Sequence, residues 1–253
     1  MRADQLLVER GLAASRAQAQ RLIGAGVQWR VGAGTAWQRV VKNSEMLPMP
    51  AELQLLDAAE TSYVSRGGLK LAGALLGSGV VAAGRLCLDV GQSTGGFTDC
   101  LLRHGAAKVV GVDVGHGQLH ASLRHNPQVV CVERINARTL SAADLGADGA
   151  MPGFDVIVGD LSFISLTLVL PALVPLLEDV SGDLLMLVKP QFELQPGQVG
   201  KGGLVKDPAL YAQVEQRIRA SCQELGLQVR GWYASAITGG DGNREFFIHA
   251  TKS

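Results

Sequence analysis

Residues 89–97 read DVGQSTGGF; they follow the apolar run 86–88 and precede a segment that begins like a helix at Thr98. A buried strand, a glycine-rich turn and a helix in this order are typical of a nucleotide-type cofactor site. Glycine has no side chain, so the backbone of such a turn can approach a ligand closely. Ser93 and Thr94 add hydroxyls beside the unpaired N–H groups at the start of the helix. The turn therefore suits an anionic or carboxylate-bearing cofactor.

Apolar runs alternate with stretches of helical spacing on both sides of this turn. The strand candidates are residues 86–90, 109–113, 129–133, 155–160 and 184–188. This rhythm predicts an α/β fold built on a parallel sheet. Two later runs, 228–234 and 245–250, are expected to pair like a hairpin at the edge of that sheet. Ligands in such folds bind beyond the carboxyl ends of the strands, where Asp89, Asp113, Asp160 and Lys189 stand.

The acid that ends the second apolar run narrows the choice of cofactor. Asp113 follows residues 109–112, and an acid at this place accepts hydrogen bonds from ribose hydroxyls. The turn matches neither GxGxxG nor GxxxxGK[ST], which disfavours a dinucleotide and a nucleoside triphosphate. S-adenosylmethionine fits better, because it has a ribose, an adenine and an amino-acid end but no phosphate. The binding residues predicted from the turn and the strand are Gly91, Ser93, Thr94, Gly95 and Asp113.

Composition excludes some classes of protein. The chain has 253 residues and is 47% hydrophobic, which is enough for a sizeable core. Its four cysteines form no CxxC pair, and neither a signal peptide nor an apolar span is seen, so we expect a reduced, cytoplasmic protein that does not enter a membrane. We expect no metal site, because His116 and His120 have helical spacing without a third ligand nearby.

Charge is unevenly distributed along the chain. The net charge is zero, yet the first 45 residues hold seven cations (Arg2, Arg10, Arg16, Arg21, Arg30, Arg39, Lys42) against three acids (Asp4, Glu9, Glu45). The leucine and isoleucine spacing in residues 6–23 predicts two short amphipathic helices, with Ser15 as the N-cap of the second. Arg16 and Arg21 would share the exposed side of that helix. A basic face of this kind favours a nucleic-acid partner.

The core GLAASRAQAQ of this segment, residues 11–20, resembles the small α+β RNA-binding module of ribosomal protein S-four. The resemblance implies an RNA-binding domain with its linker over residues 1–60, in which Arg2, Arg10, Ser15, Arg16 and Arg21 meet structured RNA through shape and phosphate contacts. The chain departs from the module in its strands, which carry Trp29 and Trp37. These side chains could pack or stack on a base, and packing is the favoured interpretation.

Four further segments, together with DVGQSTGGF, resemble the TlyA-type proteins, relatives of the FtsJ ribose methyltransferases. They are YVSRGGLKL (residues 63–71), GDLSFISL (159–166), LVKPQFE (187–193) and GGDGNREFF (239–247). The resemblance implies a Rossmann-like methyltransferase domain over residues 61–253 that uses S-adenosylmethionine. It also implies the substrate: cytidine 2′-hydroxyls in ribosomal RNA, on one or both ribosomal subunits.

The family's catalytic set carries over to Lys70, Asp160, Lys189 and Glu245. A ribose hydroxyl is a poor nucleophile, so it must be aligned with the sulfonium methyl and relieved of its proton. The resemblance makes Lys189 the candidate base or polarising group, with the acids orienting the two lysines. The alternative to a catalytic role is that these four side chains form a pair of structural salt bridges at the end of the sheet.

The resemblance also adds residues to the cofactor site. Asp89 is assigned to the amino-acid end of the cofactor, Asn136 to the neighbourhood of adenine, and Asp160 to both cofactor and catalysis. Ser162 and Phe163 could line the methyl channel or a pocket for a flipped-out nucleotide, although Phe163 could equally pack.

Two local features leave alternatives open. Gln92 stands where relatives often carry a smaller residue, so its side chain could alter cofactor affinity or point away from the ligand. Residues 195–206, QPGQVGKGGLVK, are glycine-rich and basic, as a loop over the substrate or a plain surface loop would be.

Three functions are therefore compared. The first is the rRNA methyltransferase. The second is a non-catalytic ribosome-binding assembly factor, which the intact catalytic set disfavours. The third is a hemolysin or pore-forming protein, which would need amphipathic or spanning segments that the sequence lacks. Oligomeric state is not readable from the sequence.

Overall fold

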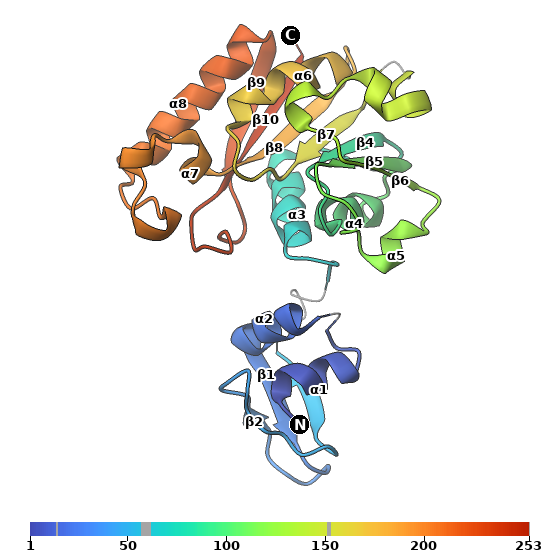
Figure 1. Ribbon diagram of the computed structural model, residues 1–253, viewed down its shortest axis with the longest axis vertical. Coiled ribbons are helices and arrows are strands. Elements are labelled where there is room, and N and C mark those ends of the chain that lie inside the picture. Colours follow the sequence, from blue (N-terminus) through green and yellow to red (C-terminus); the bar gives the residue numbers. More distant parts are fainter. Residues whose placement is uncertain (14, 57–61, 151–152, 253) are drawn as a thin grey trace. The chain divides into compact units, whose positions relative to one another are not determined.

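The computed structural model describes residues 1–13, 15–56, 62–150 and 153–252, and the chain divides into two compact units, Met1–Arg66 and Gly67–Ser253 (Figure 1). The boundary expected at residues 60 and 61, and residues 57–61 of the expected linker, lie outside the described residues.

The smaller unit packs two helices on a short antiparallel sheet. Its elements are α1 (Ala3–Glu9), α2 (Arg16–Gly26), β1 (Val27–Arg30), β2 (Gln38–Arg39) and β3 (Glu52–Leu55), with strand order β2-β1-β3. The two helices expected from leucine spacing are confirmed, and the side chain of Ser15 accepts a hydrogen bond from Gln18 N at 3.3 Å as the N-cap of α2. Trp29 packs against the core of this unit, while the ring centroid of Trp37 lies 4.5 Å from the guanidinium of Arg30.

The larger unit is built on a seven-stranded mixed sheet, so the expected α/β class is confirmed. Its strands are β4 (Leu86–Val90), β5 (Lys108–Asp113), β6 (Val129–Glu133), β7 (Val156–Gly159), β8 (Asp183–Val188), β9 (Leu227–Ala234) and β10 (Phe246–Lys252), in the order β6-β5-β4-β7-β8-β10-β9. The first five are parallel. The last two pair antiparallel at the edge, as expected, with β10 antiparallel to β8 as well.

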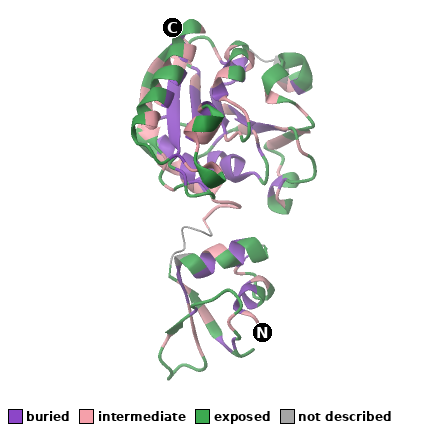
Figure 2. Cartoon of the chain, turned by 60° about the vertical axis from the view of Figure 1, so that its left-hand side comes forward, coloured by how far each residue is buried: buried purple, intermediate pink, exposed green. Residues whose placement is uncertain are grey.

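Helices cover both faces of this sheet (Figure 1). They are α3 (Gly67–Ser78), α4 (Gly96–Arg103), α5 (Ala121–Arg124), α6 (Leu170–Leu173), α7 (Pro190–Glu193) and α8 (Ala209–Glu224). Side chains of α6 and α8 share one core cluster with Leu88 and Val90, because alternate residues of a strand face the same side. On the other face, Phe97 of α4 stacks against Phe247 of β10 with ring centroids 6.0 Å apart. Figure 2 shows the result: buried strands between helices whose outer surfaces are exposed.

Parallel strands bring their carboxyl ends to one edge. β4, β5, β7 and β8 end at Val90, Asp113, Gly159 and Val188, so the turns that follow them meet there. The candidate site is built at this edge.

Candidate active site

The glycine-rich turn after β4 closes tightly on the end of β7. Gly91 has φ 84°, a left-handed conformation that favours glycine, and a Cβ there would lie 2.7 Å from the carbonyl oxygen of Asp160. A side chain at Gly91 would therefore push the two strand ends apart. Gly95, at the N-cap of α4, has φ 91°, and a Cβ there would lie 2.4 Å from a methyl carbon of Leu123. Gly95 is thus required for packing.

Asp113 is held rigidly at the end of β5. Its Oδ2 accepts a hydrogen bond from Ser93 N at 2.8 Å, and its Oδ1 accepts one from Gly115 N at 2.7 Å. Ser93 itself has φ 49°, an uncommon left-handed conformation for a residue with a side chain. Each carboxylate oxygen keeps a second lone pair, so the group is oriented and still able to accept from a ligand.

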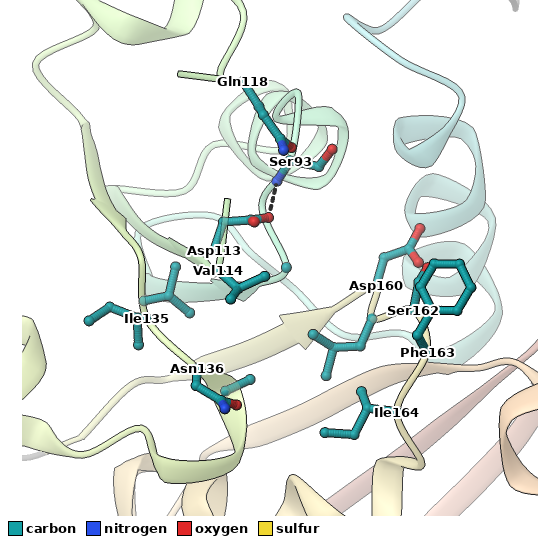
Figure 3. Close-up of a pocket in the computed structure, with 14 residues that line it drawn as sticks. Ser93, Asp113, Val114, Gln118, Ile135, Asn136, Asp160, Ser162, Phe163 and Ile164 are labelled. Carbon is teal, nitrogen blue, oxygen red and sulfur yellow. Dashed lines mark hydrogen bonds between the residues drawn. The ribbon is translucent and has the colours of Figure 1, made fainter. Parts of the chain in front are cut away.

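A cavity of about 530 Å³ opens beside Asp113 (Figure 3), within the usual size of cofactor sites. Five of the predicted cofactor residues line it: Gly91, Ser93, Asp113, Asn136 and Asp160. The sequence analysis did not select the apolar side chains of the wall or a glutamine at its rim. These are Val112, Val114, Gln118, Ile135, Ala137, Leu161 and Ile164. One charged end and one apolar wall match a ligand that has a ribose and a flat base.

The remaining predicted cofactor residues, Asp89, Thr94 and Gly95, are not among the lining residues of this cavity. Asp89 is fully buried, and its Oδ2 accepts a hydrogen bond from Thr98 Oγ1 at 2.7 Å. Its Oδ1 is buried without a hydrogen-bond partner among the described residues. Burial raises the pKa of this carboxyl to about 7, opposed by the hydrogen bond from Thr98.

Gln92 points away from the cavity, which settles its orientation. It is buried, and its Nε2 donates to Thr98 Oγ1 at 2.9 Å. The amide covers Gly111 of β5 so closely that a Cβ on Gly111 would lie 1.9 Å from Gln92 Nε2. Gln92, Thr98 and Asp89 thus form one buried hydrogen-bonded chain behind the turn.

The four predicted catalytic side chains come together from four different segments. Lys70 Nζ on α3 lies 2.6 Å from Glu245 Oε2, just before β10, and 3.8 Å from Asp160 Oδ2, just after β7. Lys189 Nζ, just after β8, lies 2.5 Å from Asp160 Oδ1. The order is therefore Lys189, Asp160, Lys70, Glu245, with charges that alternate in sign.

Burial differs along this row. Glu245 and Lys70 are buried, whereas Asp160 is partly exposed and lines the cavity. Burial raises the pKa of Glu245, opposed by the charge of Lys70 and its hydrogen bond. The Lys70–Glu245 pair is therefore the inner half of the row, and Asp160 and Lys189 form the half next to the cofactor cavity.

The short helix α7 holds the loop that follows Asp160. Lys189 Nζ donates to Ser162 Oγ at 2.8 Å, and the rings of Phe192 and Phe163 lie 5.1 Å apart. Buried Glu193 accepts from Ser165 Oγ and from Leu166 N, both at 2.6 Å. Burial raises the pKa of Glu193, and these two donors oppose the shift. The sequence analysis quoted the motif that ends in Glu193 but missed its role, because the two groups it accepts from lie 27 and 28 residues earlier in the chain.

Phe163 is displayed on that loop at the cavity mouth (Figure 3). It is 90% exposed and has φ 63°. An exposed aromatic ring in an unfavourable backbone conformation costs free energy, and such positions cluster at functional sites. Phe163 is therefore no core side chain, although its ring lies beside that of Phe192, and its role in substrate binding stays a prediction.

Two of the predicted RNA-binding arginines, Arg2 and Arg16, converge on Asp4, an acid that the sequence analysis did not select for the site. Asp4 is inaccessible to solvent; it accepts from Arg2 Nε at 3.0 Å and from an Nη of Arg16 at 2.9 Å. These guanidinium groups hold the pKa of Asp4 well below its usual range, most strongly through Arg2. Arg10 instead donates to Met49 O at 2.7 Å. Arg2 and Arg16 are thus anchored while remaining partly exposed.

No group of three or more His, Cys, Asp or Glu side chains in the described part of the chain could hold a metal ion. None of the helices described has the length and apolar character needed to span a bilayer.

Comparison with known proteins adds independent evidence. The family model described as FtsJ-like methyltransferase matches residues 63–252. The 16S/23S rRNA (cytidine-2′-O)-methyltransferase TlyA of Mycobacterium tuberculosis is 47% identical over 98% of this chain and 88% of its own. The 23S rRNA (cytidine-2′-O)-methyltransferase TlyA of Campylobacter jejuni is 34% identical over 78% of this chain and 74% of its own. A hemolysin-named protein of Streptococcus thermophilus has a solved structure with TM-score 0.76 and 38% identity, covering 100% of this chain and 88% of that one.

Proposed function

The chain belongs to the FtsJ-like methyltransferase family, and we propose that it methylates the 2′-hydroxyl of cytidine ribose in ribosomal RNA, with S-adenosylmethionine as methyl donor. The observation that carries the proposal is the row Lys189, Asp160, Lys70, Glu245 at the edge of a cavity of about 530 Å³. The two rRNA methyltransferases to which the chain is similar support the substrate.

The cavity suits S-adenosylmethionine residue by residue. Asp113 would accept from the ribose hydroxyls, and Ile135 with Asn136 would border the adenine. Gly91 lines the cavity where the amino-acid end would lie, and behind its turn the buried Asp89 keeps an Oδ1 with no hydrogen-bond partner among the described residues. When bound, the cofactor supplies an electrophilic methyl group on a sulfonium.

The catalytic row would orient and deprotonate the target hydroxyl. Lys189 lies beside the cavity, with Asp160 as its counter-ion and Ser162 as its hydrogen-bond acceptor. An ammonium has no lone pair, so Lys189 accepts the hydroxyl proton only after passing one of its own to Asp160; otherwise it polarises the hydroxyl oxygen. Lys70 and Glu245 hold Asp160 in place from the buried side. Either route needs Lys189 at the hydroxyl.

The substrate nucleotide is expected to contact Phe163, whose exposed ring at the cavity mouth offers a stacking surface for a base. We further propose that Met1–Arg66 acts as the RNA-binding module, with Arg2 and Arg16 presented by Asp4 and with Arg10, Arg21 and Ser15 on the same unit. Ribosomal subunits are the partners this implies, and the cytoplasm is the localisation.

The test is methyl transfer from labelled S-adenosylmethionine to purified small and large ribosomal subunits. The intact chain should label a subunit, Lys189→Ala should lose about 10²–10⁴-fold in rate, and primer extension should stop at a cytidine. Lys108→Ala is the matched control, because Lys108 pairs with Asp148 at the amino end of β5, away from the catalytic edge. Cofactor binding without transfer to either subunit would favour the non-catalytic ribosome-binding alternative.

A further inference from the structure

Residues 195–206, hereafter the basic arm, join α7 to α8 and carry two lysines, Lys201 and Lys206, with no acid between them. Both lysines are exposed. Neither forms an ion pair with any acid that the structure describes, whereas the other four lysines of Gly67–Ser253 (Lys70, Lys108, Lys189 and Lys252) each contact a carboxylate. The arm therefore leaves two charges available for an external anion.

The basic arm is fixed in place by one buried side chain. Asn243 is 2% exposed; its Nδ2 donates to Gly203 O at 2.8 Å, and its Oδ1 accepts from Val205 N at 2.9 Å. Tyr211 Oη donates to Val205 O at 3.0 Å from the other side. A buried amide with satisfied donor and acceptor specifies one position for a loop, so the two lysines are presented from a defined backbone.

The same anchor ties the basic arm to the catalytic row. Asn243 Nδ2 also donates to Asp241 Oδ2, which accepts from Gln191 Nε2 at 2.9 Å, and Gln191 lies two residues after Lys189. Asn243 lies two residues before Glu245. The arm is thus attached to the two segments that bring Lys189 and Glu245 to the site.

A third cation extends the charge toward β10. The guanidinium of Arg244 lies 5.5 Å from the ring centroid of Tyr211 and 5.6 Å from that of Phe246, and Arg244 is exposed. Cations over aromatic rings keep a preferred orientation at low cost. Because Tyr211 also holds Val205, Arg244 is connected to the arm through one residue.

We propose that the basic arm and Arg244 bind the sugar-phosphate backbone of the RNA strand that carries the target ribose. The inference rests on the proposed function, since that function places a polyanion at this edge of the sheet. Spaced, unpaired cations on an anchored loop suit phosphates, which fix the register of a strand without reading its bases.

The test compares Lys201→Ala/Lys206→Ala with the intact chain in binding to purified ribosomal subunits between about 50 and 200 mM salt. Each lost phosphate contact makes the slope of log binding constant against log salt concentration shallower by about 0.7–0.9, so the double variant should be shallower by about 1.5. Raising the salt over this range should therefore weaken its binding by a factor about eightfold smaller than for the intact chain. Its KM for subunits should rise while kcat and the Kd for S-adenosylmethionine stay unchanged. The control is Lys108→Ala/Arg230→Ala, which removes two positive charges that belong to β5 and β9 and not to the arm.

Unchanged binding and salt slope in the double variant would overturn the proposal, as would an equal change in the control. Because binding is measured without turnover, it tests the RNA-binding role of the basic arm independently of the proposed methyl transfer. An intact chain that transfers no methyl group refutes the proposed function, while the difference in salt slope still decides whether the basic arm binds RNA.

Discussion

Replacing Lys70 with methionine should separate the structural from the catalytic role of the row. Methionine keeps the aliphatic chain of Lys70 but removes the ammonium 2.6 Å from Glu245 Oε2, and the Glu245 side chain is only 3% exposed. A carboxylate left buried without its partner costs about 3–5 kcal/mol. For a unit of this size each kcal/mol lowers Tm by about 2–4 °C, so a fall of roughly 6–20 °C is expected at pH 8.

The loss of stability in Lys70→Met should depend on pH, and the titration of Glu245 decides the direction of that dependence. Burial already raises the pKa of Glu245, and Lys70 is the main group opposing that rise. Without Lys70 the folded-state pKa lies further above the unfolded value, so the folded protein binds a proton as pH falls. The destabilisation of Lys70→Met is therefore greatest at high pH and shrinks toward pH 5.

Urea unfolding at pH 8 and pH 5 measures this, with Lys70→Met/Glu245→Gln as the control variant. In the double variant both members of the buried pair are uncharged, so no carboxylate is left buried without a partner. This variant should regain most of the stability while remaining inactive in methyl transfer. Equal destabilisation of Lys70→Met at both pH values, or a double variant no more stable than the single one, would refute the reasoning.

Three further outcomes are expected. The pKa of about 7 for Asp89 means that stability falls as pH rises from about 4 to 7, since the folded state keeps the proton longer; Asp89→Asn should flatten this fall in pH-dependent unfolding. Gly91→Ala should destabilise the protein by about 1–3 kcal/mol and weaken S-adenosylmethionine binding in calorimetry, because its Cβ would meet the Asp160 carbonyl oxygen at 2.7 Å. Asp4→Asn should weaken RNA binding in filter assays through Arg16 without changing cofactor affinity; unaltered RNA binding would contradict its positioning role.

Much of the sheet was predictable because strands and helices leave periodic traces in the sequence. The runs at residues 86–90 and 129–133 coincide with β4 and β6, and the others differ from observed strands by one or two residues at their ends. Because ligands bind beyond the carboxyl ends of parallel strands, the sequence alone also predicts Asp113, Asp160 and Lys189 at one edge. Lys70 and Glu245 came from the family resemblance, because nothing in their spacing shows that they meet.

Other features depend on contacts that local patterns do not record. Gln92 left two interpretations open in the sequence; only its packing over Gly111, at a site where any Cβ would collide, directs it away from the cavity. Glu193 bonds to Ser165, 28 residues earlier in the chain. Asp4 has the sequence context of an ordinary acid in the first turn of a helix, and only the fold brings Arg16, 12 residues further along the chain, to it.

The succession of strands and helices, the glycine turn and the types of side chain at the edge of the sheet can be read from the sequence. Which of those side chains touch, which are buried and which stay open to a ligand depends on how the chain packs. The difference lies in the distance along the chain over which each effect acts. Backbone propensity and periodic burial act over a few residues, whereas the pairing of Lys70 with Glu245 and the anchoring of the basic arm by Asn243 arise only when distant segments pack together.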